Sequence, residues 1–87
     1  MKELCAEYTQ VVERYHNPAA DIGRRNNIEI ARGHILYMLK NLPDLGDIGQ
    51  QNRWIGFVQG WMWCNGIRDI DTLREDITKA MSRQEQL

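Results

Sequence analysis

The segment from Trp54 to Gly66 constrains the fold more than any other part of the chain, because it holds all three tryptophans and the only phenylalanine. It reads Trp-Ile-Gly-Phe-Val-Gln-Gly-Trp-Met-Trp-Cys-Asn-Gly. On a helix, with about 100° between residues, its apolar side chains point to nearly every side, which is typical of a buried helix. At about 13 residues it is shorter than the roughly 20 that a membrane-spanning helix needs. We therefore predict a central core helix.

The length of the chain fits one domain that covers residues 1–87, since domains typically run from about 50 to 250 residues. With 43% hydrophobic residues, the composition is that of a globular protein. A domain this small buries only about 60 to 65% of the surface that its unfolded chain exposes. Association with itself or with a partner would therefore add useful stability, and we keep a homo-oligomer as an open expectation.

Eleven Lys and Arg residues against 12 Asp and Glu residues give a net charge of −1. This charge does not supply the positive field of a typical phosphate-backbone binder, so nucleic acid is disfavoured as a partner. The first residues lack the basic segment and apolar run of a signal peptide, which favours a reducing cytoplasm. Cys5 and Cys64 are then expected to be free thiols. The two cysteines and two histidines also lack the short spacing of a zinc site.

Apolar residues recur at steps of three and four in four parts of the chain, which predicts four helices. We expect them from Lys2 to about Tyr15, from about Asn26 to Asn41, after an Asp47 cap, and from an Asp69 cap to about Arg83. The polar segment 21–27 either forms a loop or extends the second helix backwards, and a loop is favoured. Because no strand-like alternation occurs, the predicted fold is an all-α bundle of about four helices with the aromatic-rich third helix at its centre.

Gly56 and Gly60 lie one turn apart on the predicted third helix. Each would cost about 1 kcal/mol of stability relative to alanine. This cost is understandable if a neighbouring backbone or ring comes close, and we expect such a contact. Gly66 suits a left-handed stop at the end of the same helix.

A polar group around the first connection is a candidate ligand site, with His16, Arg24 and Arg25 as its members. Adjacent guanidinium groups bind phosphates and carboxylates through forked, charge-assisted hydrogen bonds. The competing interpretation is a solvated loop, which we favour because a short charge cluster is usually just surface.

The tryptophan cluster has two interpretations. If all three rings are buried, the cluster is the protein core, and this is the favoured interpretation. If Trp61 or Trp63 stays exposed, it becomes an anchor for a partner, as aromatic residues often are in interfaces. Arg53 is expected to lie over an aromatic ring as a cation–π contact in either case.

No catalytic constellation is visible. His34 lies at the edge of an apolar stripe, without a serine, cysteine or carboxylate placed to complete a nucleophilic arrangement, so we expect a structural histidine. Glu3 with Glu7, and Glu75 with Asp76, fall among polar positions, whereas helical metal sites point into the bundle. We therefore expect no metal, no other cofactor and no enzyme activity.

The run Arg53-Trp54-Ile55-Gly56-Phe57-Val58-Gln59-Gly60 is followed by Trp63, by Gly66 and by Leu73-Arg74. In these residues the sequence resembles a group of short, mostly uncharacterised proteins encoded by tailed bacteriophages. The resemblance covers roughly the last third of the chain and does not extend to residues 1–46. It implies a phage product that acts in the cytoplasm of a bacterial host, and it carries over no catalytic or binding residue.

These observations favour a non-enzymatic phage accessory protein that binds a host or phage protein, for example to blunt a defence system. Trp61, Trp63 and Arg53 are the candidate partner-binding residues. The alternative is a small oligomeric protein that binds a nucleotide or another anion through His16, Arg24 and Arg25.

Overall fold

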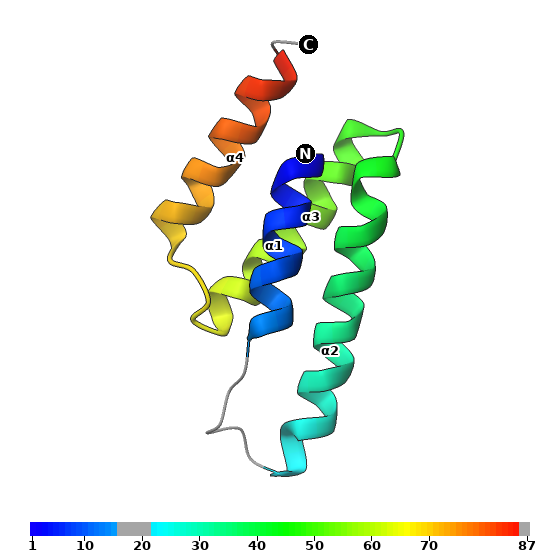
Figure 1. The fold of residues 1–87 in the computed structure, drawn as a ribbon, viewed down its shortest axis with the longest axis vertical. Coiled ribbons are helices and arrows are strands. Elements are labelled where there is room, and N and C mark those ends of the chain that lie inside the picture. The colour runs from blue at the N-terminus through cyan, green and yellow to red at the C-terminus, as the bar shows by residue number, and fades with distance from the viewer. Residues whose placement is uncertain (16–21, 86–87) are drawn as a thin grey trace.

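The computed structural model describes residues 1–15 and 22–85, and of residues 22–30 and 83–85 it describes the helical course of the backbone. Four α-helices and one short 3-10 turn make up this part of the chain, which contains no strand. Their bounds are α1 Lys2–Arg14, α2 Ile22–Asn41, η1 Leu42–Asp44, α3 Ile48–Cys64 and α4 Ile70–Glu85. Successive helices run antiparallel, and α1 lies between α2 and α4 (Figure 1). The predicted all-α bundle of four helices is confirmed.

Three residues that the sequence predicts as helix boundaries lie at helix boundaries in the structure. The Asp47 side chain accepts a hydrogen bond from the Gly49 backbone N–H at 3.0 Å, which caps α3. Asp69 accepts one from the Thr72 N–H at 2.8 Å at the start of α4, and this bond lowers the pKa of Asp69 below its ordinary value. Gly66 follows α3 with φ 70°, the left-handed conformation that glycine adopts without strain. The connection between α3 and α4 is therefore set locally.

The start of α2 differs from the prediction. The helix begins at Ile22, so the loop expected over residues 21–27 is wrong from Ile22 onward. Once the apolar residues of the later turns anchor a helix, each further turn adds hydrogen bonds without a new nucleation step. Arg24 and Arg25 are good helix formers, and they extend the helix toward its N-terminus.

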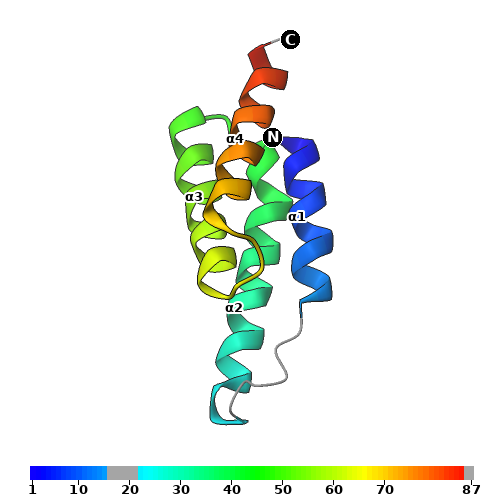
Figure 2. The ribbon, with the colours of Figure 1, turned by 90° about the vertical axis from the view of Figure 1, so that its left-hand side faces the viewer.

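The core draws side chains from all four helices. In Figure 2, α4 faces the viewer, with α3 and α1 on either side of it. Its fully covered members are Leu4, Cys5, Tyr8, Val12, Ile35, Met38, Leu39, Leu42, Ile55, Val58, Met62, Leu73 and Ala80. Most of these positions are ones that the three-four spacing predicts. In α4 the three-four spacing also predicts Ile70 and Met81 on the inward side, but both are exposed, because they flank the stripe formed by Leu73 and Ala80.

The favoured interpretation, that all three tryptophan rings are buried, is wrong because Trp63 is exposed. Ile55, Val58 and Met62 face the core, whereas 58% of Phe57 and 55% of Trp63 is exposed. The reason is the number of neighbours. α3 packs against α2 and η1, and α4 packs against α1, so no helix remains to cover the outer side of α3.

None of the helices in the described part of the chain is both long and apolar enough to cross a membrane.

The two thiols are expected to differ in reactivity. Cys5 is buried in the core and Cys64 is exposed, and burial raises the pKa of Cys5 to about 11. Because the thiolate is the reactive form, dilute folded protein at neutral pH should show one fast thiol toward a disulfide reagent such as dithiobis-nitrobenzoate. The second thiol should react only on unfolding. In a Cys64→Ala variant the fast reaction should disappear, and two fast thiols in the wild type would contradict the buried placement of Cys5.

Candidate protein-interaction face

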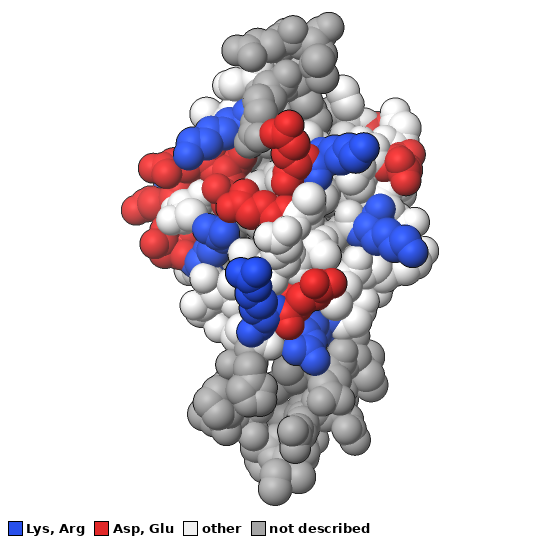
Figure 3. Space-filling view, viewed as in Figure 1, with Lys and Arg blue, Asp and Glu red and all other residues white. Residues whose placement is uncertain are grey.

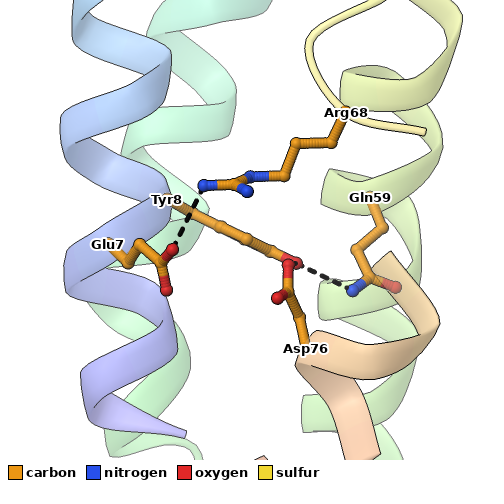
Figure 4. Close-up of polar contacts among 5 residues, drawn as sticks. All are labelled: Glu7, Tyr8, Gln59, Arg68 and Asp76. Carbon is orange, nitrogen blue, oxygen red and sulfur yellow. Dashed lines mark hydrogen bonds and ion pairs between the residues drawn. The ribbon is translucent and has the colours of Figure 1, made fainter. Parts of the chain in front are cut away.

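A polar junction inside the bundle joins α1, α3 and α4 around Tyr8 (Figure 4). The Tyr8 hydroxyl donates a hydrogen bond to Asp76 Oδ2 at 2.7 Å. The Gln59 amide Nε2 donates to the Tyr8 oxygen at 3.0 Å and to the Leu73 carbonyl at 3.1 Å. One phenol therefore ties the fourth helix to the first and the third.

Arg68, from the connection between α3 and α4, completes this junction (Figure 4). Its Nη2 donates to Glu7 Oε1 at 3.1 Å, and its guanidinium lies 5.9 Å from the centroid of the Tyr8 ring. An arginine can do both at once because its planar group stacks on a ring while its edge binds a carboxylate. The Tyr8 ring and the Glu7 carboxylate thereby hold the connection between α3 and α4 against α1.

The junction has the residue types of an active site, but its geometry indicates a structural role. Tyr8 is 0% exposed, so no substrate reaches its hydroxyl. Burial, and then the hydrogen bond to Asp76, raise the pKa of Tyr8 well above its ordinary value. A phenol that holds its proton so firmly is a poor acid or base at neutral pH. The three-four spacing of apolar residues places Tyr8 on the buried face of the first helix but gives no sign of its polar partners.

The second candidate is a surface of α2 and α3 that we call the α2–α3 face. It consists of His34 and Tyr37 from α2 and Arg53, Gly56, Phe57, Gly60 and Trp63 from α3. The five α3 positions fall within about 120° of arc on the helix, opposite the side that packs into the core. His34 links the two helices, since its ring centroid lies 6.3 Å from that of Tyr37 and 6.3 Å from that of Phe57. The predicted structural histidine is thus a surface residue in an aromatic cluster.

Gly56 and Gly60 lie in the middle of this face with nothing against them. Among the described parts of the chain, a Cβ added at either position would meet no atom within 4 Å outside the adjoining backbone of α3. The expected close approach of a neighbouring backbone or ring within the chain is therefore wrong. The two glycines weaken α3 without a compensating contact from the residues that the structure describes.

Charge is nearly absent from α3. Of its 17 residues only Arg53 is charged, and this side chain is exposed. Among the described residues Arg53 makes no ion pair and no cation–π contact, so the ring contact expected for it is wrong. Charged side chains of both signs instead cover the side of the molecule on which α1 and α4 lie (Figure 3).

The three predicted partner-binding residues have different surroundings. Trp63 and Arg53 are exposed on the α2–α3 face. Trp61 is only partly buried, and it packs edge-on against Tyr15 with the ring centroids 5.8 Å apart. Asn65 Nδ2 also donates to the Trp61 carbonyl at 2.7 Å. Trp61 therefore stabilises the contact between the end of α1 and the end of α3. The partner-binding prediction rests on Trp63 and Arg53.

The predicted ligand site falls largely outside the described part of the structure. His16 lies outside the described residues, and so do the side chains of Arg24 and Arg25. An open pocket of about 410 Å³ lies at the end of α1, lined by Val11, Arg14, Tyr15, Gly66 and Ile67. The described residues contain no group of three or more His, Cys, Asp or Glu side chains that could hold a metal ion.

Comparison with protein-family models, with curated proteins and with solved structures finds no match. The α2–α3 face and its chemistry therefore carry the functional argument.

Proposed function

We propose that this chain is a non-enzymatic phage accessory protein that acts by binding a host or phage protein through the α2–α3 face. The observation that carries the proposal is the exposure of three large aromatic side chains on one surface to which α3 contributes a single charge. Tyr37, Phe57 and Trp63 are 59%, 58% and 55% exposed. Aromatic residues of this kind supply most of the binding energy in protein interfaces, and contiguous exposed apolar surface commonly marks such a site.

The chemistry of the face favours a protein over other partners. A nucleic acid requires clustered positive charge, and Arg53 is the single cation of α3. An apolar surface with one exposed arginine suits a protein surface that combines apolar side chains with a carboxylate. In a bacterial host, the bound protein would be a component of a defence system or an enzyme that the phage redirects.

Site-specific photo-crosslinking in bacterial cells tests the proposal. A p-benzoylphenylalanine at position 57 should form an adduct with a discrete second protein, whereas the same probe at Thr78, exposed on α4, should not. Adding Trp63→Ala to the position 57 probe should lower the adduct yield at least about tenfold, because truncating an interface anchor typically costs 2 kcal/mol or more. Equal yields from positions 57 and 78, or no second protein from position 57, would contradict the proposal.

A further inference from the structure

We infer that a second copy of this chain covers the α2–α3 face, in a two-fold dimer in which the α3 helices cross at Gly60. The inference rests on the proposed function in one respect, namely that this face is a contact surface. It adds a second occupant of the same face, which covers the face in the free protein and is displaced when the host or phage protein binds. Three independent properties of the face carry it.

The first property is the space above Gly56 and Gly60. A helix normally packs with its axis 8 to 10 Å from its neighbour, and side chains set that distance. Glycines one turn apart remove those side chains and allow closer backbone approach. Inside the described chain nothing occupies this space. On the helix, the exposed side chains of Phe57 and Trp63 lie on either side of the two glycines, so a second α3 could approach the backbone between them.

The second property is charge. In a two-fold contact the same patch meets itself, so any charge on the axis faces a like charge. Charged residues make up 26% of the whole chain, yet α3 has only Arg53. Arg53 lies seven residues from Gly60, which is about 10 Å along the helix axis. In an antiparallel crossing at Gly60, the two arginines lie at opposite ends of the contact, and the α3 residues at its centre are uncharged.

The third property is area. A large aromatic side chain has about 150 to 250 Å² of surface to bury. At the exposed fractions of Tyr37, Phe57 and Trp63, the three rings offer on the order of 250 to 430 Å² per chain. A standard interface buries about 800 Å² per partner, of which roughly 65% is apolar in homodimers. The rings thus provide half or more of the apolar area, and the glycine backbone and His34 extend it.

Measurement of the mass in solution tests the inference. The purified wild type should sediment at twice the monomer mass of 10.2 kDa at about 100 µM. Gly60→Arg places a charge and a long side chain at the crossing, and it should raise the dissociation constant at least about 100-fold. Thr78→Arg, which adds the same side chain to an exposed position of α4, should remain dimeric.

Folding does not confound this comparison, because an added Cβ at position 60 meets nothing within 4 Å in the described chain outside the adjoining backbone. Far-ultraviolet circular dichroism should confirm that both variants are helical. Phe57→Glu provides a second disruption of the same face and should also give monomers. A wild type that is monomeric at 1 mM, or equal dissociation constants for Gly60→Arg and Thr78→Arg, would overturn the inference.

The photoprobe at position 57 separates this inference from the proposed function. In the purified protein it should give an adduct of twice the chain mass. If that adduct forms and cells yield no second protein, the dimer stands and the proposed function fails. If cells yield a second protein while the purified chain is a monomer, the proposed function stands and the dimer fails.

Discussion

Replacing Tyr8 with alanine is expected to lower the free energy of unfolding by about 3 to 5 kcal/mol, the range for removing a buried aromatic side chain. Tyr8 is 0% exposed and contacts α3, α4 and Arg68. Small domains are stable by only about 5 to 15 kcal/mol in total. Tyr8→Ala should therefore be largely unfolded or unfold at a much lower urea concentration, as followed by circular dichroism.

Tyr8→Phe is the matched control, because it keeps the ring and removes only the hydroxyl. It leaves the Asp76 carboxylate and the Gln59 amide without their shared partner, which should cost about 1 to 3 kcal/mol. The expected order of stability is wild type, then Tyr8→Phe, then Tyr8→Ala. A loss below about 1 kcal/mol in Tyr8→Ala would show that Tyr8 does not hold the core together.

The second large effect is a loss of stability at alkaline pH. Burial raises the pKa of Cys5 to about 11 and also raises that of Tyr8, against ordinary values of about 8.5 and 10. Between the ordinary pKa and the raised pKa of each group, the folded state keeps a proton that the unfolded chain has lost, so stability falls as the pH rises. The contribution of Cys5 is complete below about pH 8.5 and is lost toward pH 11, and that of Tyr8 begins to fall near pH 10.

Each group lowers stability by up to about 1.4 kcal/mol per pH unit within its window. The measurement is the urea midpoint from pH 8 to pH 11. Cys5→Ala should flatten the decline from about pH 8.5, and Tyr8→Phe should flatten it above about pH 10. If the variant that combines Cys5→Ala with Tyr8→Phe loses stability as steeply as the wild type, other groups cause the alkaline unfolding.

The helices were predictable because their signals are local. Asp47, Asp69 and Gly66 act on backbone groups two or three residues away, and the three-four spacing of apolar residues marks the face that each helix buries. The start of α2 was not predictable in the same way, since its first turns are polar and carry no boundary signal of this kind. The polar character of Arg24 and Arg25 fits a loop and an exposed helix equally well.

The junction and the interaction face depend on contacts that the sequence does not encode locally. Tyr8 and Asp76 are 68 residues apart, and their hydrogen bond requires α4 to lie on α1. The exposure of Phe57 and Trp63 follows from the same placement, because α4 meets the side of α3 that carries Gln59 and leaves the side with Phe57 and Trp63 open. Hydrophobic content measures how much surface a helix can bury, and the number of neighbouring helices decides how much it does bury.

The cation–π contact of Arg68 with Tyr8, and the hydrogen bond of Tyr8 to Asp76, couple the effects of substitutions at positions 8, 68 and 76. Lysine at position 68 would keep the positive charge near Glu7 but would lose the flat guanidinium that lies on the ring. A non-aromatic residue at position 8 would remove the surface beneath Arg68 and the donor to Asp76 together. The effects of substitutions at these three sites on stability should consequently be non-additive.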